Sequence, residues 1–315
     1  MLRHLVGRGA FIWIWLIASP AMAVVESAAP AATDPGTPWW IWPVILFFFC
    51  LAIGILAVLA GVGGGVLYVP LVSGFFPFHL DFVRGAGLLV ALAGALAAGP
   101  GLLKRNLANL RLAMPVALIA SSCAVVGAVM GLALPTNIIQ ILLGATIIGI
   151  AILLSLSKSV EYPEVKASDG ISRALGITGI YHEESTGKNV EWRIHRSPLG
   201  FGLFIIIGIM AGMFGLGAGW ANIPVLNLVM GAPLKLAVGT SKFLLSITDT
   251  SAAWIYLNQG CVIPLIAVPS IVGLMLGSII GVRILAKTKP KSIRYIVIAV
   301  LLFAGLKALM KGLGL

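Results

Sequence analysis

The chain has 315 residues, of which 60% are hydrophobic and only 10% charged, and its net charge is +11. Soluble domains carry about 25% charged residues, so this composition excludes an ordinary soluble domain and predicts a membrane protein with many apolar helices. The basic residues lie at the ends of apolar segments rather than on one face, which argues against nucleic acid as a partner and fits positive-inside membrane topology.

The first 38 residues predict a signal sequence followed by a linker. Two arginines precede an apolar run that ends in the small-x-small sequence Ala-Met-Ala at residues 21–23. This pattern is typical of a cleaved secretory signal, so residues 1–23 are predicted to be a signal peptide, with an uncleaved first helix as the alternative. Residues 24–38 are rich in Ala, Pro, Thr and Asp, and we expect them to form an extracytoplasmic linker.

Apolar segments then follow in two sets, which we interpret as a first transmembrane repeat at 39–157 and a second at 198–315. The segments are 41–76, 84–103, 110–134 and 137–156 in the first set, and 199–231, 237–257, 262–286 and 293–310 in the second. The leading segment of each set is longer than one straight crossing requires, and a glycine run interrupts it. His79 and Asp81 fall between the first two segments, in an expected solvated turn.

The two glycine runs are related by a constant offset of 154 residues. Gly61, Gly63, Gly65 and Pro70 recur as Gly215, Gly217, Gly219 and Pro224, while Gly85 recurs as Gly239 and Pro115 as Pro269. No gap is needed between the first match and the last. The chain is therefore predicted to be a duplication, with one glycine-broken helix in each half.

A polar stretch separates the two repeats, and residues 158–197 are predicted to form a cytoplasmic loop. Within it, the range Ile177–Arg196 has a Ser-Thr-Gly-Lys turn between two strand-like runs. This arrangement predicts a small β-hairpin outside the bilayer, with a flexible linker as the alternative.

Loop charges predict that the two repeats are inverted in the membrane. The loop at 104–111 is basic and its counterpart at 258–261 is uncharged, whereas the loop at 134–137 is uncharged and its counterpart at 283–294 is basic. Because basic loops stay in the cytoplasm, equivalent loops lie on opposite sides. Each half then crosses an odd number of times. The glycine-broken segment must therefore enter and return, as a re-entrant or short helix.

Broken helices at matching positions in inverted halves indicate a transport site, because irregular backbone in a bilayer is tolerated only where protein buries it or water reaches it. Their free N–H groups suit an anion. The candidate substrate-binding residues are Gly61, Gly63, Gly64, Gly65, Arg84, Gly215, Gly217, Gly219, Asn222, Thr240, Ser241 and Lys242. The alternative for the glycines is close helix packing. A dinucleotide-binding loop is excluded, because membrane sequence flanks both runs.

Two of the charged residues lie inside the same apolar segment. Lys242 and Asp249 are seven positions apart, so they share one helix face about two turns apart. We expect Lys242 to supply positive charge to the anion and Asp249 to couple transport to an ion, since intramembrane acids often serve proton relays. The alternatives are a structural ion pair for these two, a helix cap for Thr240 and Ser241, and snorkelling to the interface for Arg84.

At these residues the chain resembles the TauE/SafE family of sulfite and organosulfur anion exporters. The resemblance rests on the Gly-x-Gly-x-Gly…Pro run of both halves and on the sequence Ala-Val-Gly-Thr-Ser at 237–241, and it covers most of residues 44–156 and 199–311. It implies a bacterial inner-membrane permease for small sulfur-containing anions. The first half departs from the pattern, with Arg-Gly-Ala-Gly at 84–87, which implies an asymmetric site.

We therefore predict a multi-pass secondary transporter that exports sulfite or an organosulfonate by alternating access. The expected partners are the small anion, the lipid bilayer, a coupling proton or sodium ion, and further copies of the chain. No cofactor, metal or enzymatic activity is expected, because neither zinc-ligand spacing nor a nucleophile elbow occurs, and three scattered cysteines make no disulfide framework. The alternatives are a passive anion channel, or a membrane assembly or sensory protein with the hairpin as its docking module.

Overall fold

The computed structural model describes residues 40–60, 63–104, 108–156, 163, 165, 167–183, 188–285 and 290–314. The predicted signal peptide and linker lie outside these residues. The long helices are α2 (Ile41–Ala60), α4 (Leu80–Lys104), α5 (Leu110–Ala133), α6 (Thr136–Leu156), α8 (Ser197–Phe214), α10 (Leu234–Asn258), α11 (Pro264–Leu285) and α12 (Pro290–Leu313). The shorter elements are α3 (Gly64–Phe75), α7 (Gly170–Ala174), α9 (Gly219–Pro224), the π-helix η2 (Val225–Val229), and strands β1 (Thr178–Glu183) and β2 (Lys188–Arg193).

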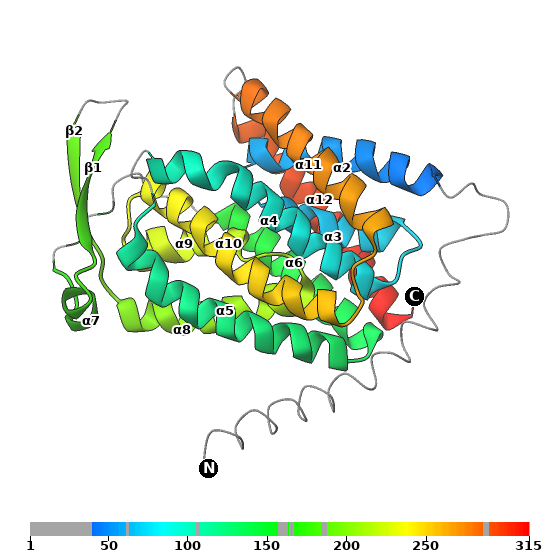
Figure 1. Cartoon of the computed structure of the whole chain (residues 1–315), viewed down its shortest axis with the longest axis horizontal. Coiled ribbons are helices and arrows are strands. Elements are labelled where there is room, and N and C mark those ends of the chain that lie inside the picture. Colours follow the sequence, from blue (N-terminus) through cyan, green and yellow to red (C-terminus); the bar gives the residue numbers. More distant parts are fainter. Residues whose placement is uncertain are drawn as a thin grey trace, which may run out of the picture.

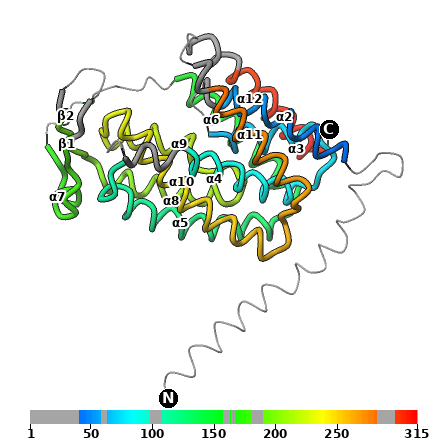
Figure 2. The backbone as a smooth tube through the Cα atoms, turned by 45° about the horizontal axis from the view of Figure 1, so that its top comes forward, coloured from blue at the N-terminus to red at the C-terminus, as the bar shows by residue number. Residues whose placement is uncertain are grey.

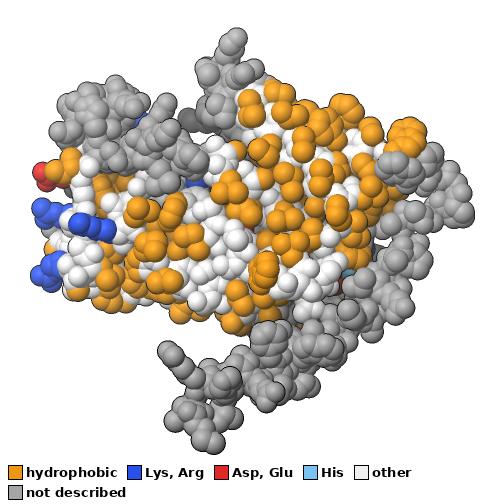
Figure 3. All heavy atoms as spheres, in the orientation of Figure 1, with side chains coloured by type: hydrophobic (Ala, Val, Ile, Leu, Met, Phe, Trp, Pro, Cys, Tyr) orange, Lys and Arg blue, Asp and Glu red, His pale blue; other side chains and the backbone are white. Residues whose placement is uncertain are grey.

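The helical body has the composition of a membrane protein. Within the described residues, five helices are long and apolar enough to cross a membrane, namely α4, α5, α6, α8 and α11. Large apolar side chains face outward along these helices, for example Leu118 with 66% of its surface exposed. Figure 3 shows hydrophobic side chains spread over the body, whereas the Lys and Arg side chains of this face gather at one end. The predicted helical membrane architecture is therefore confirmed.

The starting residues of the long helices recur at a constant spacing along the chain. Helices α4, α5 and α6 start at Leu80, Leu110 and Thr136, and α10, α11 and α12 start at Leu234, Pro264 and Pro290, which is 154 residues later in each case. The boundaries of the elements therefore follow the same offset as the glycine runs.

The main helix pairs each join the first half of the chain to the second. Helix α2 packs on α11, α5 on α8, α4 on α10 and α6 on α12 (Figures 1 and 2). Small residues let the backbones approach: Gly127 faces the backbone of Ile209, and Gly277 faces that of Leu51. Gly-rich contacts of this kind are a normal basis for helix association in membranes. Here they hold the two halves of the chain together.

Helices α4 and α10 pack antiparallel, and so do α6 and α12. Near the start of α4, the Arg84 guanidinium lies 5.6 Å from the ring centre of Tyr256, which is near the end of α10. Beyond the other end of α4, the Asn109 N–H donates to Oγ1 of Thr240, near the start of α10, over 3.3 Å. The contacts between α6 and α12 follow the same antiparallel order.

Both glycine-broken segments reverse direction. At the start of α2, the Trp42 ring packs against Phe76 and Phe78, which follow the end of α3, with ring centres 6.0 and 5.6 Å apart. Just before α8, the His195 N–H donates to the carbonyl of Met230, which follows η2, over 3.0 Å. Helix α8 starts at the end of the molecule that carries the hairpin, and α2 starts at the other end (Figure 1). The two segments thus enter from opposite ends.

The predicted β-hairpin is confirmed. Strands β1 and β2 pair antiparallel, from Thr178 opposite Arg193 to Glu183 opposite Lys188. Together with α7 they form a small unit at one end of the helical body (Figure 1). The side chains of Ile177 and Ile194 are buried beneath it. We call residues 167–196 the hairpin module.

One carboxylate fastens the hairpin module to the helical body. Oδ2 of Asp169 accepts from the Ser197 N–H over 2.9 Å, and Oδ1 accepts from the Ser197 hydroxyl over 3.0 Å and from the Ser172 N–H over 3.2 Å. Asp169 therefore caps the first turns of both α7 and α8. Partial burial raises its pKa, but the hydrogen bonds from Ser172 and Ser197 outweigh that effect and hold the pKa below its ordinary value.

Replacing Asp169 with alanine should loosen the hairpin module without unfolding the membrane helices. Loss of a cap costs about 1 kcal/mol, and two caps depend on this side chain. Because the pKa of Asp169 is lowered on folding, its contribution is present at neutral pH and is lost as the pH falls below about 4. Hydrogen exchange of residues 167–196 should therefore rise in the variant at pH 7, and in the wild type only in acid. Equal protection of wild type and variant at pH 7 would contradict the anchoring role.

Candidate functional site

The two glycine breaks meet inside the molecule. A Cβ atom built on Gly63 would lie 4.0 Å from the Cα of Gly219, and one built on Gly219 would lie 3.8 Å from the Cα of Gly63. Gly65 packs on the carbonyl of Leu216 in the opposite break. We call this contact region, made by Gly63, Gly65, Gly217 and Gly219, the glycine junction. Gly61 lies outside the described residues.

The second break needs glycine for its backbone shape. Gly215 and Gly217 have φ values of 68° and 69°, in the left-handed region that residues with a Cβ rarely adopt. Gly215 ends α8, and its N–H donates to the carbonyl of Ala211 over 3.0 Å. A Cβ on Gly217 would lie 3.0 Å from both Oδ2 of Asp249 and the Cβ of Ala91. The junction is thus closely packed against α4 and α10.

One face of α10 lies along the junction. Leu245 packs against Gly217 and Gly219, at 3.4 and 3.2 Å from the Cβ positions that those glycines lack. Lys242 lies about one turn before Leu245 on this face, and Asp249 about one turn after it. No nitrogen–oxygen contact within 4.0 Å joins Lys242 to Asp249. The two charges therefore flank the junction instead of forming a direct pair.

Buried polar groups without partners gather around the second break. Neither polar atom of Asn222 and neither carboxylate oxygen of Asp249 has a hydrogen-bond partner in the described part of the chain, and both residues are only 1% exposed. The indole N–H of Trp220 is buried and unpartnered as well. Buried polar groups are normally hydrogen-bonded, so this set is suited to a ligand or ion. Trp220 was not among the sequence candidates, although it directly follows Gly219.

Arg84 is held by protein groups at the edge of the second break. Its Nη1 donates to the carbonyls of Met213 over 2.8 Å and Gly131 over 3.1 Å, and its Nη2 pairs with Asp81. The Tyr256 hydroxyl donates to the neighbouring carbonyl of Gly212 over 3.1 Å. The contacts to Met213 and Gly212 satisfy carbonyl groups at the end of α8, which the break at Gly215 leaves without helical partners, and the contact to Gly131 satisfies a carbonyl at the end of α5.

Asp81 departs from its sequence prediction. It was expected in a solvated turn, but it lies in the first turn of α4 with its side chain only 17% exposed. The Arg84 guanidinium compensates its charge, which explains why it can leave water.

The remaining candidates lie outside the contacts that form the junction. Thr240 is fully buried, and its hydroxyl oxygen accepts from the N–H of Asn109 at the start of α5. It lies two residues before Lys242, which places it about 200° around α10 and away from the junction face. Ser241 is buried next to it. Gly64 packs against the side chain of Leu274. The binding roles of these residues stay predictions.

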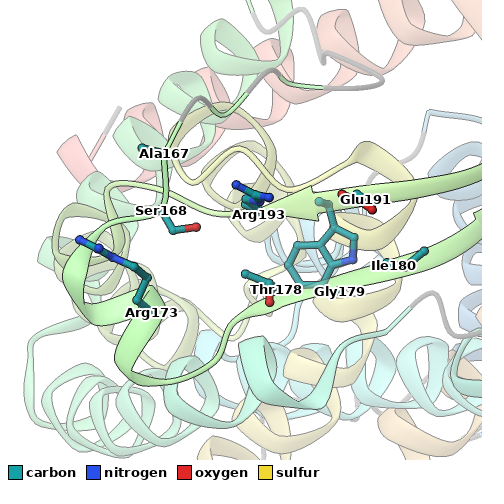
Figure 4. A pocket seen from close by; sticks show the side chains of 9 residues that line it. Ala167, Ser168, Arg173, Thr178, Gly179, Ile180, Glu191 and Arg193 are labelled. Carbon is teal, nitrogen blue, oxygen red and sulfur yellow. The ribbon is translucent and has the colours of Figure 1, made fainter.

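The described residues offer other features outside the junction. No group of three or more His, Cys, Asp or Glu residues that could hold a metal ion occurs among them. An open groove of about 680 Å³ lies in the hairpin module, between α7 and the base of the hairpin, where Arg173, Thr178 and Trp192 are among its lining residues (Figure 4). This groove is separate from the glycine junction.

Comparison with known proteins places this architecture in a family. The family model described as sulfite exporter TauE/SafE matches residues 45–308, which include both glycine breaks and the junction. The chain belongs to the TauE/SafE family. It is also 24% identical to the Probable membrane transporter protein YunE of Bacillus subtilis strain 168 over 277 residues, which cover 86% of this chain and 98% of the relative. No solved structure gives a significant match. With five apolar spans among its described residues, this TauE/SafE member is a multi-pass membrane protein.

Proposed function

We propose that this TauE/SafE protein is a secondary transporter that exports a small sulfur-containing anion, such as sulfite or an organosulfonate, across the bacterial inner membrane. The family and the name of its relative YunE support a membrane transporter. The observation that carries the proposal is the glycine junction, where two broken helices meet beside the buried, unpartnered Asn222 and Asp249. Irregular backbone and unsatisfied polar groups at such a place are typical of a transport site.

The two halves act, in this proposal, as inverted repeats whose broken segments are re-entrant. Three observations support it. Helix α4 packs antiparallel on α10, and α6 on α12. The broken segments start from opposite ends of the molecule (Figure 1). The exposed arginines Arg173, Arg193 and Arg196 gather at the hairpin end, which the positive-inside rule assigns to the cytoplasm.

The anion occupies the glycine junction. Backbone N–H groups at the start of α3 and the amide of Asn222 donate hydrogen bonds to it, and Lys242 supplies the positive charge. Access alternates as one repeat rocks against the other, a motion that leaves the site itself near the middle of the membrane. A proton or sodium ion couples the movement.

The test is anion flux through purified protein in proteoliposomes. Thermal shifts with sulfite, sulfate, thiosulfate and methanesulfonate first identify the anions that bind. The Lys242→Gln variant should then lose about 10- to 100-fold in flux of a bound anion, because a hydrogen bond to a charged group contributes about 1.5–3 kcal/mol.

The matched control is Arg111→Gln, which removes an exposed positive charge at the start of α5 and should leave flux unchanged. Wild-type flux in the Lys242→Gln variant would contradict the proposed site. Flux that never builds an anion gradient under any imposed proton or sodium gradient would favour a passive channel instead.

A further inference from the structure

We infer that an anion and a proton occupy the glycine junction together, so that one proton moves with each monovalent anion in the same direction. The inference rests on the proposed transport function and adds to it the identity of the coupling ion and the sign of the coupling. It starts from Asp249, which is 1% exposed and contacts Gly217 of the junction.

The Asp249 carboxylate has no hydrogen-bonding partner and no direct ion pair in the described part of the chain. Both of its oxygens lack a hydrogen-bond partner. The adjacent Thr248 hydroxyl has one proton, which it donates to the carbonyl of Leu244 over 2.9 Å. Taking an ionised carboxylate out of water without a partner is strongly unfavourable, so such a group gains a proton or a nearby cation.

The charged groups around Asp249 are few. On α10, Lys242 is the charge that acts on it, while Tyr256 is hydrogen-bonded to the carbonyls at the end of α8. Helices α8, α9 and η2 carry no titratable side chain. Among the described side chains, helix α4 contributes Asp81 and Arg84, which pair with each other about two turns beyond Asp249. Helix α5 contributes the exposed Arg111 and the half-buried Cys123. Lys242 is thus the positive charge that can compensate an ionised Asp249.

The net charge of the junction then determines how anion binding is coupled to proton binding. With the site empty, a charged Lys242 balances an ionised Asp249, and the junction is neutral. A monovalent anion adds one negative charge, and the junction is neutral again only if Asp249 takes up one proton. Like charges close together in a low-dielectric interior repel strongly, so anion binding and protonation of Asp249 favour each other. By linkage the effect is reciprocal.

The consequence is electroneutral cotransport. Both the empty junction and the doubly loaded junction are neutral, so each can reorient without moving net charge across the membrane. The junction holding the anion alone, or the proton alone, carries a net charge and reorients poorly. Export then proceeds when the outward anion gradient exceeds the inward proton gradient.

The experiment uses wild-type protein in proteoliposomes with a pH-sensitive dye trapped inside. The lumen is loaded with methanesulfonate, which stays a monovalent anion at neutral pH and carries no proton of its own, and the vesicles are diluted into methanesulfonate-free buffer. The lumen should become alkaline as the anion leaves, with one proton per anion. Clamping the membrane potential with potassium and valinomycin should leave the rate unchanged.

The negative results of this experiment distinguish failure of the coupling inference from failure of the proposed function. Methanesulfonate efflux with a constant or acidifying lumen, or efflux that requires sodium, overturns the inference and leaves the proposed function standing. Absence of flux for both methanesulfonate and sulfite overturns the proposed function and the inference with it.

A pair of variants tests the residue itself. Asp249→Asn imitates the protonated side chain, so exchange of internal for external methanesulfonate should persist while the lumenal pH change falls at least tenfold. Thr250→Asn, an exposed neighbour on α10, is the matched control and should keep the wild-type pH change. An undiminished pH change in Asp249→Asn overturns the assignment to Asp249. In the wild type, the KM for methanesulfonate should also fall as the pH is lowered, and a KM independent of pH overturns the linkage.

Discussion

Replacing Gly217 with alanine should abolish anion transport while most of the helical packing stays in place. The φ of 69° at this position costs a residue with a Cβ about 1–2 kcal/mol. The added methyl group would also lie 3.0 Å from Oδ2 of Asp249 and from the Cβ of Ala91, so the second break must move away from α4 and α10. Flux in proteoliposomes and the thermal unfolding temperature, measured on the same preparation, separate loss of the site from loss of the fold.

Gly149 provides the matched control. It lies inside α6, and a Cβ there would meet no atom within 4 Å. Gly149→Ala should keep wild-type flux and gain about 0.5–1 kcal/mol of stability, because alanine favours a helix more than glycine does. A Gly217→Ala variant with wild-type flux would show that the junction tolerates displacement, and the proposed site would then be wrong.

Replacing Arg84 with methionine should destabilise the protein strongly. The guanidinium is 2% exposed and bonds to the carbonyls of Met213 and Gly131 and to Asp81. Removing one partner of a buried charged network costs about 3–5 kcal/mol, because the groups left behind stay buried. The expected result is a markedly lower unfolding temperature in detergent, with a KM for the anion near the wild-type value in the folded fraction.

The Arg111→Met variant is the control, because Arg111 is exposed and its loss should change the unfolding temperature little. The experiment also separates two roles for Arg84. A variant of wild-type stability with a strongly raised KM would assign Arg84 to the anion, whereas low stability with an unchanged KM assigns it to the end of α8.

The sequence predicted those features of the fold that depend on neighbouring residues or on a regular repeat along the chain. The gapless offset of 154 residues predicted a second set of helices, and α4 and α10 begin at Leu80 and Leu234 accordingly. A turn sequence between strand-like runs was enough to predict the hairpin. Glycines with no apolar side chain to bury marked the breaks, and the opposite charge character of equivalent loops required each broken segment to reverse.

Contacts between residues that are far apart in the sequence could not be predicted from it. Arg84 donates hydrogen bonds to the carbonyls of Gly131 and Met213, which are 47 and 129 residues away in the sequence. No local sequence pattern indicates either partner. The pairing of Thr240 with Asn109 is equally remote in sequence. Such contacts depend on which helices become neighbours, so the sequence could propose the glycines, Lys242 and Asp249 as candidates but could not predict the contact between Gly63 and Gly219.

The way the helices pair also bears on whether either half of the chain can fold alone. The main helix pairs, from α2 with α11 to α6 with α12, each take one member from the first half of the chain and one from the second. A single half would leave the small-residue faces of these helices unpaired. Each half therefore depends on the other for its closest helix contacts, and the chain folds as one unit rather than as two independent halves.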